Sequence, residues 1–258
     1  MEGLSEREVQ SQPEKVIRVQ LAACYRLISM FGMTDLIYNH ITAAVPGSPG
    51  HFFINAYGLD YSEITASSLF KIDLEGTVIS RPDLPYDVNK AGYIIHSAVH
   101  AARHDVTCVI HTHTRAGVAV SAMKCGLSPI SQTALRFTRR IGYHDFEGPA
   151  TSQDERARIA ANLGDNDALV LRNHGLLVCG RSIPETFHLM QRLETACRIQ
   201  VDALASGMEI EFPSVESQRR TEEILGRDTS LQEVPANGNL EWAALIRRLD
   251  KLDTSYRD

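Results

Sequence analysis

The sequence predicts a layered α/β fold in which one main domain covers residues 14–207. Two kinds of segment alternate along this range, namely stretches with apolar residues at helical spacing and short runs rich in β-branched and aromatic residues. No linker or shift in composition divides the range, and 43% hydrophobic residues are enough for a sizeable core. Residues 208–258 are more polar and are interpreted as a C-terminal extension.

The first part of the domain is predicted to form one helix followed by paired strands. Residues 13–31 carry apolar side chains at a period near 3.6, which is typical of a helix with one buried face. Residues 36–46 and 51–58 flank the turn-rich sequence PGSPG and predict a hairpin. Residues 70–80 predict a further strand pair joined at a Glu-Gly turn.

The second part of the domain alternates helices with strands. Residues 88–103 form an apolar stripe at helical spacing and lead into a strand over 106–114. Two S-x-x-E capping boxes predict the starts of helices over 152–164 and 182–207. Between these helices, residues 167–180 show two apolar runs separated by Arg-Asn-His-Gly, a strand–turn–strand pattern.

The C-terminal extension contains one amphipathic segment. Its apolar residues are Trp242, Leu245, Ile246 and Leu249, which share one side of a helix. We expect this segment to pack on a neighbouring subunit.

Composition narrows the choice of partners and compartment. The formal charge of −6 argues against a nucleic acid or an anionic membrane surface as the main partner, because phosphate groups require clustered Lys and Arg. No apolar run approaches the ~20 residues of a membrane-spanning helix. The five cysteines are widely spaced without a C-x-x-C pair, which is typical of a reducing compartment. The sequence therefore predicts a cytoplasmic protein.

The stretch CVIHTHTRAG contains the clearest candidate for a metal site. His111 and His113 lie two positions apart at the end of a predicted strand, so their side chains point to the same face. His174 lies in the turn between two apolar strands, where Asn and Gly shape the backbone around it. Three histidine nitrogens are the protein share of an open catalytic metal site, but spacing alone does not show that they converge.

A second group of histidines competes with the first. His96, His100 and His104 recur every four residues on the predicted helix, so they share one face. No glutamate follows His96 in the H-E-x-x-H sense. We therefore interpret this face as a polar flank of the helix.

Several stretches together resemble the class II aldolase/adducin family. They are NHIT, EITASSLFKID, HTHT and RNHG, in this order along residues 18–207. The resemblance implies a three-layer α/β/α fold with a largely antiparallel central sheet, and a homotetramer with active sites at subunit interfaces. It also implies that His111, His113 and His174 bind a divalent ion, usually Zn²⁺, with Mn²⁺ or Fe²⁺ as alternatives.

The chain departs from the sugar-phosphate aldolases of this family at two places. These enzymes carry a glutamate near the start of the helix that precedes H-x-H, where this chain has Gly92, with Asp87 as the nearest carboxylate. Their phosphate-binding asparagine, in a Gly-Asn-x-Ser pattern, is replaced by His40. The resemblance is therefore closer to the adducin-like branch, and it indicates an unphosphorylated substrate.

Proton transfer requires a further side chain, and the sequence offers several. The YHDFEG stretch supplies Tyr143, His144 and Glu147 as the predicted catalytic residues, with Asp145 beside them. Outside that stretch, the candidates are His40 and Glu63.

Three functions remain open from the sequence. A lyase would use the ion to stabilise the enolate formed when a C–C bond breaks beside a carbonyl of a small hydroxy- or oxo-acid. An oxygenase would hold Fe(II) with the same histidines. A non-catalytic, adducin-like oligomerisation module would use the metal, if at all, as a structural clamp.

Overall fold

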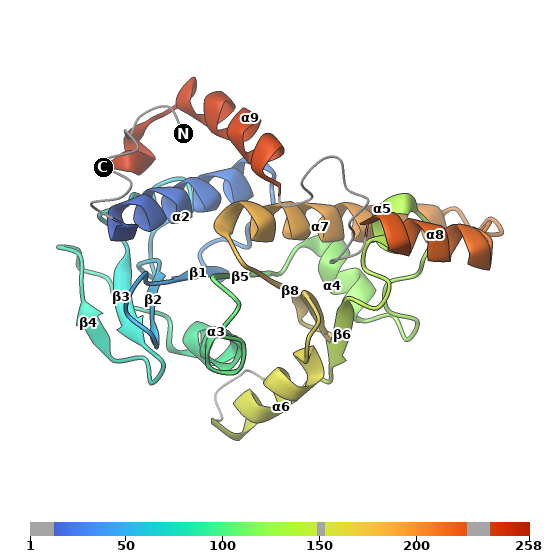
Figure 1. The fold of residues 1–258 in the computed structure, drawn as a ribbon, viewed down its shortest axis with the longest axis horizontal. Coiled ribbons are helices and arrows are strands. Elements are labelled where there is room, and N and C mark those ends of the chain that lie inside the picture. The colour runs from blue at the N-terminus through green and yellow to red at the C-terminus, as the bar shows by residue number, and fades with distance from the viewer. Residues whose placement is uncertain (1–12, 149–152, 226–237) are drawn as a thin grey trace.

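The computed structural model describes residues 13–148, 153–225 and 238–258, and its centre is one eight-stranded sheet (Figure 1). The strand order is β4-β3-β2-β1-β5-β8-β7-β6, and every described neighbouring pair is antiparallel except β6 and β7. The strands are β1 (His40–Ala44), β2 (His51–Ile54), β3 (Phe70–Asp73), β4 (Val78–Ser80), β5 (Cys108–Thr112), β6 (Ile141–His144), β7 (Ala168–Leu171) and β8 (Gly175–Gly180).

Helices cover both faces of this sheet, which confirms the predicted three-layer α/β/α architecture (Figure 1). One face carries α3 (Lys90–Ala102) and α6 (Gln153–Leu163), which pack on each other and on the sheet. The other face carries the remaining helices, most of which pack around the larger core. They are α2 (Pro13–Met30), α4 (Arg115–Ser121), α5 (Gln132–Leu135), α7 (Ile183–Ala205), α8 (Val215–Leu225), α9 (Asn239–Asp250) and the 3₁₀ turn η1 (Ser255–Arg257). Helix α8 has no buried residue and contacts α5.

Most of the predicted helices and strands are present, and the strands are shorter than the predicted ranges. The hairpin forms from β1 and β2, but β1 begins only at His40, because residues 36–37 form a turn in which Leu36 has φ 47°. The predicted start of α7 is confirmed, since the Ser182 hydroxyl accepts a hydrogen bond from the Glu185 N–H, while the Glu185 carboxylate accepts from the Arg181 N–H. The first box begins at Ser152, which lies outside the described residues.

The C-terminal extension folds back on its own chain. Trp242, Ile246 and Leu249 are at most 8% exposed and belong to the large core formed with α2 and α7. The apolar stripe that we expected to pack on a neighbouring subunit is thus buried within the chain, because α2 and α7 leave an apolar groove along which α9 lies.

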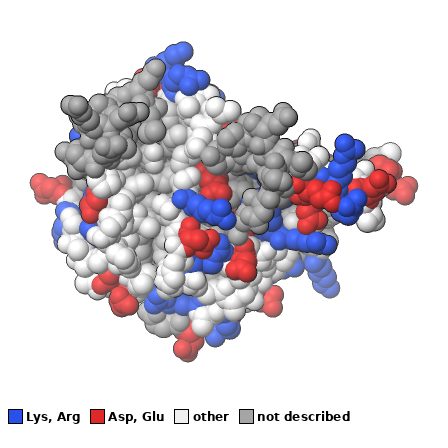
Figure 2. All heavy atoms as spheres, viewed as in Figure 1, with Lys and Arg blue, Asp and Glu red and all other residues white. Residues whose placement is uncertain are grey.

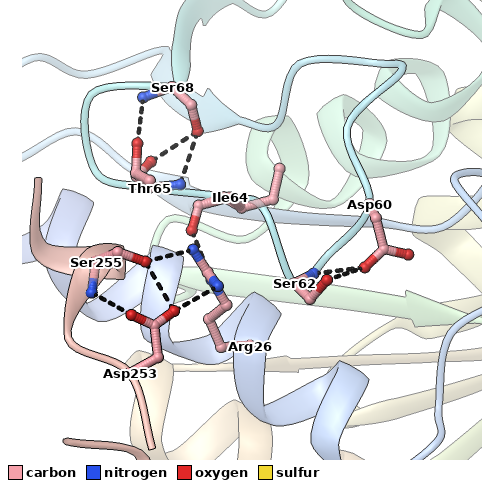
Figure 3. A network of polar contacts seen from close by, with 8 residues as sticks. All are labelled: Arg26, Asp60, Ser62, Ile64, Thr65, Ser68, Asp253 and Ser255. Carbon is pink, nitrogen blue, oxygen red and sulfur yellow. Dashed lines mark hydrogen bonds and ion pairs between the residues drawn. The ribbon is translucent and has the colours of Figure 1, made fainter.

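A polar network fixes the end of the extension to the body of the protein (Figure 3). The Arg26 guanidinium on α2 pairs with the Asp253 carboxylate at 3.0 Å and donates to the Ile64 carbonyl. The backbone then pairs directly, since the N–H groups of Ala66 and Ser67 donate to the carbonyl oxygens of Tyr256 and Asp258. These contacts therefore tie the C-terminal residues both to α2 and to the segment over residues 64–67.

The surface carries charges of both signs. On the face shown in Figure 2, Lys and Arg side chains are interspersed with Asp and Glu among the residues that are coloured. Within the described ranges, none of the helices combines the length and apolarity that crossing a bilayer requires.

Candidate metal centre

Three histidines from two neighbouring strands converge at one edge of the sheet. His111 is the next-to-last residue of β5, His113 directly follows the strand, and His174 occupies the turn between β7 and β8. The Nε2 atom of His113 lies 2.8 Å from Nε2 of His111 and 2.9 Å from Nε2 of His174. Among the described residues, these three side chains form the one group with ligand atoms close enough to share a metal ion.

The hydrogen bonds of the other ring nitrogens determine where the protons are. Nδ1 of His111 lies 2.9 Å from the Leu176 carbonyl oxygen, and Nδ1 of His113 lies 3.0 Å from a carboxylate oxygen of Asp35. Both oxygens only accept hydrogen bonds, so both Nδ1 atoms carry the proton. The two Nε2 atoms therefore present lone pairs to each other.

Facing lone pairs at 2.8 Å repel each other unless a metal ion or an additional proton lies between them. The chemistry of this donor set thus fits a metal ion, and the carboxylate–histidine pair of Asp35 and His113 is a common support for a metal ligand. A tetrahedral ion with bonds of about 2.0–2.1 Å separates its nitrogens by about 3.3 Å, so the rings need to open by a few tenths of an ångström.

Burial keeps two of the rings neutral. It lowers the pKa of His111 well below its usual value, and the nearby His174 and His113 rings lower it further. The pKa of His174 falls to about 4, again mainly through burial, with contributions from His113 and His144. A metal ligand must offer an unprotonated nitrogen, so these rings are suited to hold an ion at neutral pH.

The backbone around His174 explains how the third ring reaches the other two. Asn173 has φ 56°, a left-handed conformation that Asn tolerates better than most residues, and this directs the following side chain toward β5. Gly175 lies against the neighbouring strand, because a Cβ atom there would be 2.3 Å from the Thr112 carbonyl oxygen. A glycine is thus required for β8 to approach β5 closely enough.

The second histidine group does not form a comparable site. The Thr42 hydroxyl lies 2.8 Å from both Nδ1 of His96 and Nε2 of His100, while the His104 side chain is exposed. These contacts are hydrogen bonds through a threonine of β1, so His96 and His100 pack against the sheet, and only His104 lies on an exposed flank of the helix end.

Comparison with known proteins identifies the family. The family described as "Class II Aldolase and Adducin N-terminal domain" matches residues 19–201. The chain belongs to the class II aldolase/adducin family. A putative aldolase class 2 protein of Pseudomonas aeruginosa is 48% identical over 96% of this chain and 94% of its own length.

Two further relatives show the breadth of the family. Alpha-adducin of Rattus norvegicus is 50% identical over 75% of this chain, which corresponds to 26% of that protein. The solved structure of L-fuculose 1-phosphate aldolase from Glaciozyma antarctica has a TM-score of 0.82 and 25% identity, with 95% of this chain and 93% of that chain covered. This chain is thus similar both to an aldolase and to an adducin, and its sequence identity to the adducin is the higher of the two.

Two of the three residues predicted to be catalytic lie beside one of the three histidines, His174. His144 and Glu147 line a small crevice together with Arg172 and His174. The Asn162 amide donates to Nδ1 of His144, so the His144 proton lies on Nε2.

Tyr143 is not brought to this crevice. It precedes His144 on β6 and therefore points to the opposite face of the sheet. Its hydroxyl accepts from the Leu127 N–H at 3.1 Å, and the Arg172 guanidinium stacks 4.4 Å from its ring centroid. Tyr143 thus holds the segment around Leu127 and the Arg172 side chain in place.

Gly92, where the resemblance led us to look for a glutamate, lies against a histidine ring. A Cβ atom added to Gly92 on α3 would lie 2.3–2.5 Å from three ring atoms of His40. Asp87 is exposed and lies 3.8 Å from Arg81, away from this contact. Glu63 is also exposed and accepts from the Asp60 N–H.

One site residue was missed by sequence reasoning. Asp35 precedes β1 and is not adjacent in sequence to any of the histidines, so nothing in its local pattern pointed to a metal centre. The unusual conformation of the next residue, Leu36, is visible only in the structure.

Proposed function

We propose that this protein is a divalent-metal-dependent lyase that cleaves or forms a C–C bond beside a carbonyl of a small, unphosphorylated hydroxy- or oxo-acid. The observation that supports this most is the convergence of three Nε2 atoms, two of which must carry lone pairs. In this proposal His111, His113 and His174 hold the ion, which is Zn²⁺, with Mn²⁺ or Fe²⁺ as alternatives. When bound, the ion supplies positive charge beside the carbonyl and stabilises a developing enolate.

The side chains in the crevice have distinct roles in this proposal. Arg172 lines the crevice, but its guanidinium stacks on the Tyr143 ring and donates to the Met123 carbonyl oxygen, so we assign it a structural role. Arg158 binds Glu147 through both carboxylate oxygens and lowers the pKa of Glu147, so this carboxylate is ionised at neutral pH. We assign the proton transfer to His144 and Glu147, whereas Tyr143 positions Arg172 from the other face of the sheet.

The decisive experiment combines metal analysis with an activity screen. Protein purified without added metal should contain one divalent ion per chain, and a His113→Ala variant should lose it. Wild-type protein should catalyse retro-aldol cleavage or decarboxylation of some unphosphorylated hydroxy- or oxo-acids, and a His144→Gln variant should retain metal but lose most of this activity. Full metal content in His113→Ala would overturn the proposed site.

The 50% identity to alpha-adducin favours one alternative, a non-catalytic oligomerisation module. That function predicts stable self-association without turnover on any substrate of the panel. Light scattering tests the homotetramer that we propose in either case. Iron in the metal analysis, together with oxygen uptake in the presence of 2-oxo acids, would instead support an oxygenase. The cytoplasmic location stays a prediction from the sequence.

A further inference from the structure

The His40 imidazole is a buried polar group whose nitrogens are unsatisfied. The side chain is 4% exposed, and neither ring nitrogen has a hydrogen-bond partner among the residues that the structure describes. A neutral imidazole carries one donor and one acceptor, and leaving a buried polar group unpaired costs about 1–3 kcal/mol. The cost of burying the unpaired His40 ring is recovered if a ligand supplies the missing hydrogen bonds. We therefore expect His40 to bind a ligand.

The position of His40 relates this ring to the metal centre. His40 on β1 is the direct antiparallel partner of His111 on β5, so both side chains lie on the same face of the sheet. The His113 and His174 rings are close enough to His40 to lower its pKa. His40 therefore lies beside the three ligands without being one of the converging set.

The contact with Gly92 holds the ring in place. Since a Cβ atom at Gly92 would be 2.3 Å from both Cε1 and Nε2 of His40 and 2.5 Å from Cδ2, the ring lies across the glycine Cα. His96 on the same helix packs edge-on against His40, with 5.9 Å between the ring centroids. Gly92 thus provides the space that this imidazole needs, and a larger residue at position 92 is incompatible with the present position of the ring.

The ring is uncharged in this environment. Among the described residues no carboxylate or other acceptor lies within hydrogen-bond distance of either ring nitrogen, so nothing nearby stabilises a second proton on the ring. A neutral imidazole donates one hydrogen bond and accepts another, which matches a hydroxyl or carbonyl oxygen better than a phosphate dianion.

We propose that His40, held against Gly92, contacts the substrate directly and selects an uncharged oxygen, a hydroxyl or a carbonyl, next to the three-histidine site. This inference rests on the proposed function, because the substrate lies beside His40 only if the three histidines form the active centre. It assigns to His40 a specificity role at its contact with Gly92.

The test uses the cobalt-substituted protein and hydroxyacetone, an uncharged probe with a carbonyl and a hydroxyl oxygen. Cobalt absorption reports both metal binding and probe binding without any turnover. In a His40→Leu variant we expect the cobalt affinity to stay within twofold of wild type and the probe affinity to fall at least tenfold. His188→Leu is the control, because His188 is also buried with an unpartnered Nε2 but contacts α9.

A second variant changes the position of the ring without removing it. Gly92→Ala pushes His40 away from its site and should also weaken the probe, whereas Gly92→Ala added to His40→Leu should cause little further loss. His40→Asn serves the same purpose if His40→Leu does not fold.

The outcomes separate this inference from the proposed function. Unchanged probe affinity in both His40→Leu and Gly92→Ala, with cobalt bound, overturns the role of His40 and leaves the metal centre intact. Loss of cobalt from folded His40→Leu also overturns it, because His40 would then be a ligand. Failure of wild-type protein to bind cobalt removes the proposed function and this inference together.

Discussion

The Asp35 carboxylate accepts a hydrogen bond of 3.0 Å from Nδ1 of His113, although the two residues are 78 positions apart in the sequence. This contact fixes the tautomer of His113 and turns Nε2 toward the other two histidines. Loss of such a support typically reduces metal affinity by about 10–100-fold. We therefore expect Asp35→Asn to bind Zn²⁺ about 10–100-fold more weakly, as measured by competition with a chromophoric chelator.

The control for this prediction is Asp60→Asn. Asp60 is another loop carboxylate that accepts hydrogen bonds from Ser62, but it does not contact any of the three histidines. Equal zinc affinity of Asp35→Asn and wild type would show that Asp35 does not support the site.

Gly175→Ala should disturb the sheet and the metal centre together. The added methyl group would meet the Thr112 carbonyl oxygen at 2.3 Å, so β8 has to move away from β5. Overpacking of this kind typically costs about 1–3 kcal/mol, and we expect urea unfolding to show a loss in this range. Cobalt titration of the same variant should show weaker binding, and unchanged stability would contradict the close approach of the strands.

Trp242→Ala should destabilise the whole domain. Trp242 is 6% exposed, and its ring packs against Phe187 of α7 at 5.9 Å between centroids. Truncating a buried aromatic side chain costs about 3–5 kcal/mol. Urea unfolding should reveal this loss, whereas Leu240→Ala on the same helix, where the side chain is 64% exposed, should change stability little.

The metal-free protein should lose stability as the pH falls from about 6.5 to 4. Burial lowers the pKa of His188 to about 4, with Arg136 and Arg192 lowering it further, whereas an unfolded histidine titrates near 6.5. Between these values the unfolded chain binds a proton that the folded chain does not, so acid favours unfolding. Thermal melts across this range should show a shallower decline for His188→Gln. Identical slopes would contradict the lowered pKa.

The sequence predicted the framework of the fold because its elements have strong local patterns. Helix α7 has an apolar stripe and a capping serine at residue 182, and both signals are local. Helix α4 and strand β6 were not predicted, because α4 follows the HTHT stretch directly and β6 has only four residues next to an arginine-rich turn. Short elements of this kind form through tertiary contacts, as with β6, which pairs in parallel with β7.

The three-histidine site was predictable only in part, because some of its contacts depend on how the strands pair. Strand alternation is sufficient to place His111 and His113 on one face. The approach of His174, which is 61 positions from His113, depends on the pairing of β5 with β8. The contacts of Asp35 and His40 depend likewise on a loop and on the β1–β5 ladder, neither of which has a local sequence signal.

The ladder between β1 and β5 also determines where this chain can tolerate insertions. A strand that slips by one residue exposes the opposite set of side chains, so inserting one residue between Ile41 and Thr42 would place Ile41 opposite His111 and break the polar cluster. The turn over residues 46–50 connects β1 to β2 at the surface and is far less constrained. Extra length added in that turn should leave the histidine constellation in register, whereas the same length added inside β1 should abolish it.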